Sequence, residues 1–119
     1  MRAIAYIQFD DKAPQDSDTS QRTQEEQIGR FVDRNHHTLA QIFADPLGNE
    51  SVHREGLTKM FQYLSGEPVQ FLVLVTDPTH LGSMPVEALG RIREVEDLGS
   101  KVVCTMDEVS DPLQAMYSI

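Results

Sequence analysis

The segment Ala3–Phe9 is apolar on both of its alternating faces. A half-exposed strand alternates apolar with polar residues, whereas a strand that helices cover on both sides stays apolar throughout. The segment therefore predicts a central strand in a sheet flanked by helices. It stops at Asp10 and Asp11, and ligands in α/β proteins usually gather at the carboxyl ends of such strands.

Three further strands are predicted by apolar runs bounded by turn residues: Thr38–Phe43, Val69–Val75 and Lys101–Met106. The polar stretch 10–20 has no periodicity and predicts a loop. The alternation of strands with helical patterns predicts an open α/β fold with a mostly parallel sheet and helices on both faces.

Three helices are predicted between these strands. Thr23 and Glu26 match a capping box that would begin the first helix, with Ile28, Phe31 and Val32 facing inward. The second carries the stripe Leu57, Met60, Phe61 and Leu64, which Gly66–Pro68 ends. The third would have Ser83 as N-cap and Pro85 in its first turn, with Val86, Leu89 and Ile92 apolar, and would end at Gly99.

Composition limits the classes of function. The chain has 119 residues, 39% of them hydrophobic, which predicts a single domain. A formal net charge of −9 disfavours unaided binding to nucleic acid. Cys104 lies in an apolar run, where we expect a buried structural thiol. Neither a membrane span nor a signal peptide is visible, so we expect a cytoplasmic protein.

Carboxylates at the expected strand ends raise the question of a metal. Asp10, Asp11 and Asp77 would suit Mg²⁺ if the fold brought them together. Aspartate is also an ordinary turn residue, and we favour that interpretation. His36-His37 has no further ligand at metal spacing, and no glycine-rich phosphate loop follows the first strand, so we expect no metal and no cofactor.

Taken along the whole chain, several motifs resemble the catalytic domain of resolvase/invertase-type serine recombinases. These motifs are Tyr6-Ile7-Gln8-Phe9-Asp10 at the first strand, Gln24 and Ile28 in the first helix, Phe43-Ala44-Asp45, Arg54-Glu55-Gly56-Leu57, and Thr79-His80-Leu81-Gly82-Ser83-Met84. The resemblance implies a resolvase-like, flavodoxin-like three-layer fold over residues 1–119. It also implies that the family's long dimerisation helix and DNA-binding domain are missing here.

The departures from the family pattern affect the residues that carry out the family's reaction. Asp10 stands where the family has its nucleophilic serine, and Gln8 replaces an arginine beside it. Thr79, His80 and Ser83 stand where the family has an aspartate and two arginines, which leaves Arg54 as the one retained arginine. Because such residues act as a unit, their joint loss predicts a pseudoenzyme.

Two main functions follow from these interpretations, and a lesser third is an accessory factor that meets DNA through a partner. The first is a non-catalytic module that binds a protein partner, either a second copy or a recombinase relative, without contacting DNA itself. The second is a receiver-like, Mg²⁺-dependent phosphoacceptor, since Asp10, Asp11, Asp77 and Thr105 match the two acids, acceptor aspartate and hydroxyl of such domains. No lysine follows Thr105, so we rank the phosphoacceptor second.

Overall fold

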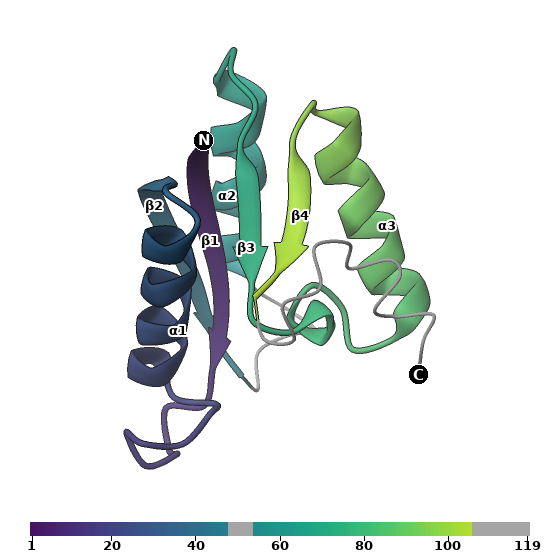
Figure 1. Ribbon diagram of the computed structural model, residues 1–119. Helices are drawn as coiled ribbons and strands as arrows, with labels where there is room; N and C mark the ends of the chain where they lie inside the picture. The colour runs from purple at the N-terminus through teal and green to yellow at the C-terminus, as the bar shows by residue number, and fades with distance from the viewer. Residues whose placement is uncertain (48–53, 106–119) are drawn as a thin grey trace.

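The computed structural model describes residues 1–47 and 54–105. In chain order the elements are β1 (Arg2–Phe9), α1 (Gln21–Arg34), β2 (Thr38–Pro46), α2 (Glu55–Gly66), β3 (Leu72–Val75), the 3₁₀ helix η1 (Pro78–His80), α3 (Pro85–Asp97) and β4 (Lys101–Cys104). All three strand pairings are parallel, and the sheet order is β2-β1-β3-β4. Figure 1 shows that the strands all point the same way, so their carboxyl ends share one edge.

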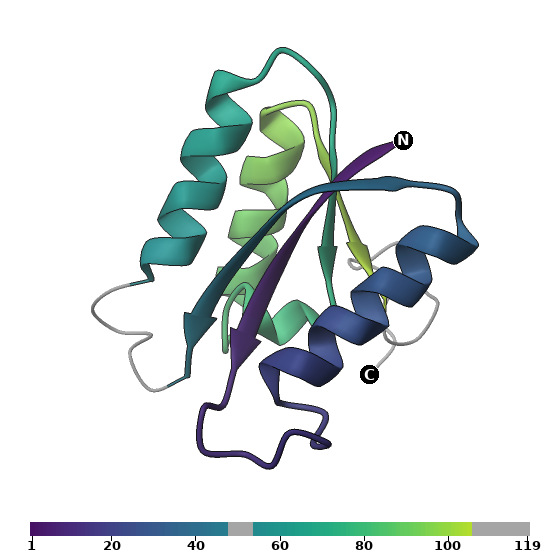
Figure 2. The same cartoon turned by 90° about the vertical axis from the view of Figure 1, so that its left-hand side faces the viewer.

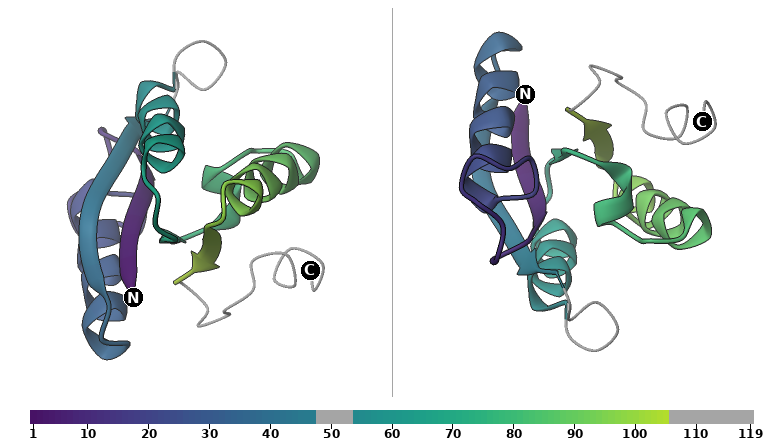
Figure 3. Two further views of the ribbon diagram at one scale, coloured as in Figure 1. Left: turned by 90° about the horizontal axis from the view of Figure 1, so that it is seen from above. Right: turned by 90° about the horizontal axis from the view of Figure 1, so that it is seen from below.

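The helices cover both faces of this sheet, as the apolar pattern of β1 predicted. Helix α1 lies on one face, and α2 and α3 lie on the other (Figures 2 and 3). Side chains of β1 alternate accordingly: Ala3, Ala5 and Ile7 pack with α1, whereas Ile4 and Tyr6 pack with α2 and α3. The α/β fold with a parallel sheet and helices on both faces is therefore confirmed.

Two of the expected N-cap residues are wrong. Helix α1 begins at Gln21, and Ser20, not Thr23, is its N-cap, because the Ser20 hydroxyl accepts the Thr23 N–H at 3.1 Å. Helix α3 begins at Pro85 as expected, but its N-cap is Met84, and Ser83 is exposed. A proline at the first helical position needs no side-chain cap for its own nitrogen, since that nitrogen carries no hydrogen.

Strand boundaries also differ from expectation. β2 extends three residues beyond Phe43, to Pro46. β3 begins at Leu72 and not at Val69, whose side chain is 40% exposed. β4 ends at Cys104, and Met106 lies outside the described residues. Cys104 is buried as expected, and its thiol contacts the Thr76 carbonyl at 3.4 Å.

Among the described residues, no helix is long and apolar enough to cross a membrane.

Candidate functional site

Asp45, at the end of β2, is the structural centre of the edge where the strands end. Its carboxylate is buried and accepts three hydrogen bonds: the backbone N–H groups of Gly56 and Leu57 at 2.8 and 2.9 Å, and the Tyr6 hydroxyl at 2.7 Å. The two N–H groups belong to the first turn of α2, which Arg54 does not cap through its own side chain. Asp45 therefore caps α2 from a neighbouring strand, in place of a local cap.

Gly56 is the residue that lets this cap form. A Cβ atom there would lie 2.4 Å from the Ala44 carbonyl oxygen and 2.8 Å from its carbonyl carbon. Both atoms belong to the β2 backbone, so they cannot turn aside as a flexible side chain would. The sequence Arg54-Glu55-Gly56-Leu57 thus places glycine where the first turn of α2 lies against the β2 backbone.

Arg54 lies at the N-cap of α2 and points toward β1 and η1. Its guanidinium donates to the Tyr6 hydroxyl at 3.0 Å, to the Leu81 carbonyl at 3.4 Å and to the His80 carbonyl. It also stacks over the Tyr6 ring, 5.4 Å from the ring centroid. The retained arginine of the expected site is therefore held by one hydroxyl, one ring and two backbone carbonyls.

Tyr6 links Asp45 to Arg54 and keeps its proton. Burial raises the pKa of the Tyr6 hydroxyl well above its usual value, and the hydrogen bond to Asp45 raises this pKa further, while Arg54 partly opposes both effects. The neutral hydroxyl donates to Asp45 and accepts from Arg54. One phenol thus orients both charged groups.

Gln24 of α1 joins the ends of β1 and β3 on the opposite face. Its Nε2 group donates to the carbonyls of Gln8 at 2.9 Å and Thr19 at 3.2 Å, which uses both of its hydrogens. Its Oε1 atom accepts the Thr76 hydroxyl at 3.1 Å. Gln24 is fully buried, so the donor and acceptor roles of its amide are fixed by these three partners.

His80 continues this network through Thr76. Because the Thr76 hydroxyl gives its one proton to Gln24, it can only accept at the 3.4 Å contact with His80 Nδ1, and the proton of the neutral imidazole therefore sits on Nδ1. Burial lowers the pKa of His80, and Arg54 lowers it further, while Asp77 opposes them. The imidazole is held neutral where the family pattern has an arginine.

The other positions of the expected recombinase site are dispersed. Gln8 is buried and opposite Asp45 in the β1–β2 register. Thr79 is exposed, and its N–H and hydroxyl both bond the Asp77 carboxylate, which caps η1. Ser83 is exposed before α3. Among these six positions, Gln8, Asp10, Arg54, Thr79, His80 and Ser83, Arg54 and His80 bond directly, through the His80 carbonyl.

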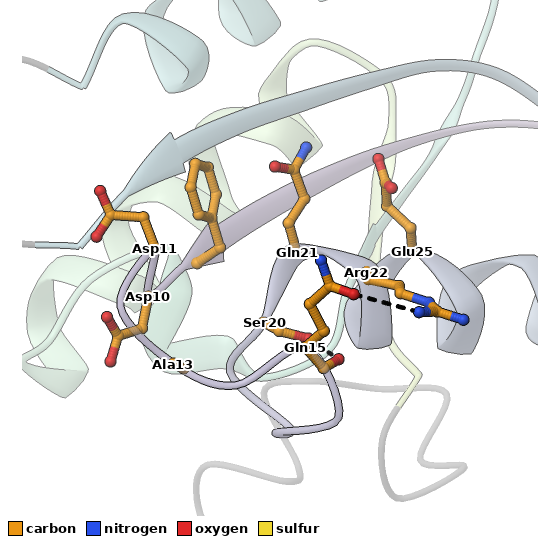
Figure 4. Close-up of a pocket in the computed structure, with 9 residues that line it drawn as sticks. Asp10, Asp11, Ala13, Gln15, Ser20, Gln21, Arg22 and Glu25 are labelled. Atoms are coloured by element: carbon orange, nitrogen blue, oxygen red, sulfur yellow. Dashed lines mark hydrogen bonds between the residues drawn. The ribbon is translucent and has the colours of Figure 1, made fainter.

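Asp10 and Asp11 line a separate surface hollow of about 520 Å³ between the loop after β1 and the start of α1. The Asp10 carboxylate accepts the Lys12 N–H at 3.0 Å, and the Asp10 N–H bonds the Thr19 carbonyl at 3.0 Å. In Figure 4 both carboxylates lie at the opposite end of the view from Arg22, whose guanidinium donates to Gln15. Asp10 thus organises its own loop.

The residues of the alternative acidic pocket do not all line one hollow. Asp77 and Thr105 do not line the hollow that holds Asp10 and Asp11. The Asp77 carboxylate instead accepts hydrogen bonds from Thr79 in η1. Within residues 1–47 and 54–105, no group of three or more His, Cys, Asp or Glu side chains is arranged to hold a metal ion. Asp10, Asp11 and Asp77 therefore do not form such a group, and Asp77 caps η1 as a turn aspartate does.

Two residues of this edge were missed by sequence reasoning. Thr76 connects Gln24 to His80, and Arg91 of α3 donates to the Leu81 carbonyl beside Arg54. Thr76 directly follows a buried strand, and polar residues at the carboxyl end of a strand are candidates for a functional site. Nothing in the sequence pattern distinguishes Arg91 from Arg93, its neighbour on the same helix.

Comparison with solved structures supports the fold. The C-terminal catalytic domain of ISC1926 TnpA, an IS607-like serine recombinase, superposes with a TM-score of 0.71 at 19% identity over 99% of this chain and 76% of that one. A resolvase family site-specific recombinase from Streptococcus pneumoniae superposes with a TM-score of 0.76 at 15% identity, over 99% of this chain and 84% of that one. The N-terminal catalytic domain of TP901-1 integrase superposes with a TM-score of 0.76 at 11% identity, over 98% of this chain and 88% of that one.

No curated protein sequence matches the chain. The family described as "Resolvase, N terminal domain" matches residues 10–118, which is most of this chain. With the parallel sheet, the Asp45-capped helix and the retained Arg54 already in place, this match identifies the chain as a member of the resolvase N-terminal domain family.

Proposed function

We propose that this domain is a catalytically inactive member of its family and that it acts by binding protein, either a second copy of itself or a recombinase relative. The observation that carries the proposal is Asp10, which stands where the resembled family has its nucleophilic serine. Its carboxylate is engaged with the backbone of Lys12 in its own loop. A carboxylate there also repels the phosphodiester that a serine hydroxyl would attack.

The remaining residues of the edge support the same conclusion. A serine recombinase stabilises the attacked phosphate with several arginines, because charge that develops on the phosphate oxygens needs preorganised donors. In this chain Gln8, His80 and Ser83 occupy three of those positions, and His80 is held neutral by burial and by Arg54. Arg54 alone supplies too little stabilisation for phosphoryl transfer.

The net charge of −9 favours protein over DNA as the partner. DNA-binding proteins gain much of their affinity by neutralising phosphates with lysine and arginine, and this chain has 10 such residues against 19 acidic ones. Phosphate contact therefore costs electrostatic work that contact with a protein surface does not. The domain would then use the fold of a recombinase to bind a protein partner.

The experiment mixes the chain with a full-length, active resolvase-family recombinase from the same genome and that enzyme's own recombination-site DNA. The two proteins differ in mass, so a denaturing gel of labelled DNA separates their covalent DNA adducts. We expect an adduct on the active recombinase only, and co-elution of this chain with that recombinase or with itself in size-exclusion chromatography.

The active recombinase is the internal positive control, because its adduct proves that DNA, buffer and site are competent. The variant Asp10→Ser is tested alongside and should also stay free of DNA, since Gln8 and His80 remain. A DNA adduct on the unmodified chain would refute the loss of catalysis. A chain that elutes as a monomer and does not co-elute with the active recombinase would refute the binding role.

A further inference from the structure

Two arginines from different helices converge on one backbone oxygen at the strand-end edge. Arg54, at the start of α2, and Arg91, at the middle of α3, both donate to the Leu81 carbonyl. Leu81 is fully buried and directly follows η1, so its carbonyl is fixed in place. The segment 78–82 therefore brings together two guanidinium groups that the sequence separates by 37 positions (91 − 54).

Neither guanidinium has an acidic partner in the part of the chain that the structure describes. The one ion pair there, with nitrogen and oxygen within 4.0 Å, joins Arg22 to Glu26. Glu87 and Glu94 flank Arg91 at helical spacing on α3, yet neither pairs with it. Asp45 shares the Tyr6 hydroxyl with Arg54, and its oxygens are occupied by α2 and Tyr6.

The donors of Arg54 are also incompletely used. Its Nε–H group is buried and has no hydrogen-bond partner among the described residues. A carbonyl oxygen carries only a partial charge, so two guanidinium cations that share one carbonyl repel each other with little compensation. An anion placed between them would remove that repulsion and supply acceptors to both cations.

We propose that Arg54 and Arg91 together bind a carboxylate presented by the protein partner, either an aspartate or glutamate side chain or a chain terminus. The inference rests on the proposed binding function and specifies its chemistry. Arginine is suited to this task because its planar donors match the two oxygens of a carboxylate.

A carboxylate fits this site better than a phosphodiester of DNA. A single carboxylate brings one negative charge to a chain that already carries −9, whereas DNA brings a row of phosphates that the surrounding acidic surface repels. Met84 and Val86, 60% and 81% exposed, lie on the segment between Leu81 and Arg91. They offer the apolar contact that protein partners use around a charged anchor.

The test is an NMR titration of the chain with sodium acetate, with sodium chloride adjusted to hold the ionic strength constant. The Nε–Hε resonances of the arginines report on each guanidinium separately. We expect saturable shifts at Arg54 and Arg91 and none at the exposed Arg93. In Arg91→Gln the acetate affinity measured at Arg54 should fall by about tenfold or more, since one charge-assisted donor group is lost.

The matched control is Arg93→Gln, which removes the same charge from the same helix and should leave acetate binding at Arg54 unchanged. A parallel titration uses dimethyl phosphate as a phosphodiester probe. Absence of saturable acetate shifts, an unaffected Arg54 in Arg91→Gln, or dimethyl phosphate binding as tightly as acetate would each overturn the proposal. The titration contains neither DNA nor partner, so its failure leaves the proposed loss of catalysis and the binding role standing.

Discussion

At the scale of single residues, Gln24 has the most demanding role because three different segments depend on its amide. It satisfies the Gln8 and Thr19 carbonyls and accepts the Thr76 hydroxyl, all without solvent access. Gln24→Glu keeps the shape but removes both donors, which leaves buried carbonyls facing a carboxylate. We expect a loss of about 2–4 kcal/mol in the free energy of unfolding, measured by urea denaturation.

Gln21→Glu is the matched control for that variant. Gln21 is exposed in the first turn of the same helix, where an added negative charge is favourable. Its free energy of unfolding should stay within about 0.5 kcal/mol of the parent protein. Equal effects of the two variants would show that charge, and not the buried amide network, determines the result.

His80 predicts how stability depends on pH. Its folded pKa is lowered by burial, below the value of about 6.5 for an unfolded histidine. The unfolded chain therefore binds more protons as pH falls through this range, and the free energy of unfolding should decrease from about pH 7.5 to 5.5. His37, whose pKa burial also lowers, adds to this decrease.

The variant His80→Asn keeps a donor for Thr76 and removes the titration. Its free energy of unfolding should vary less with pH over the same range than that of the parent protein, with the His37 contribution remaining. Urea denaturation at several pH values measures the difference. A pH dependence identical to the parent's would contradict the assignment of the His80 pKa.

At the scale of elements, the strands and helices were predictable because their hydrophobic periods are distinct, while several of their ends were not. Ser20 and Thr23 are both good N-cap residues, and only the loop geometry, in which Ser20 also donates to the Gln15 carbonyl, selects Ser20. The environment of Arg54 was equally hidden. Two of its partners are backbone carbonyls, which side-chain identity cannot reveal.

The start of α2 gives the element-scale prediction. Gly56→Ala places a methyl group against the Ala44 backbone, so the helix must shift away from β2 and weaken its hydrogen bonds to Asp45. We expect a loss of about 2–4 kcal/mol in the free energy of unfolding. Gly90→Ala, in open space within α3, should instead stabilise by up to about 1 kcal/mol. A neutral Gly56→Ala would show that the close approach is dispensable.

At the scale of the whole molecule, both layers of the core meet on β1. This strand pairs with β2 along its whole length and with β3 at Ala3–Ala5, and every residue from Ala3 to Ile7 is fully buried. Packing with α1 occupies one of its faces and packing with α2 and α3 the other. Opening β1 therefore requires both layers to come apart, which is equivalent to unfolding the domain.

Amide hydrogen exchange measures this directly. The hydrogen-bonded amides of β1 should exchange last, with an opening free energy equal to the free energy of unfolding from urea denaturation. The amides of β4, a four-residue strand at one end of the described sheet order, should exchange sooner. Slower exchange in β4 or α3 than in β1 would place the most stable unit in the layer that holds Arg91. The carboxylate site would then lie on the rigid part of the domain, and the Asp10 loop on the part that opens first.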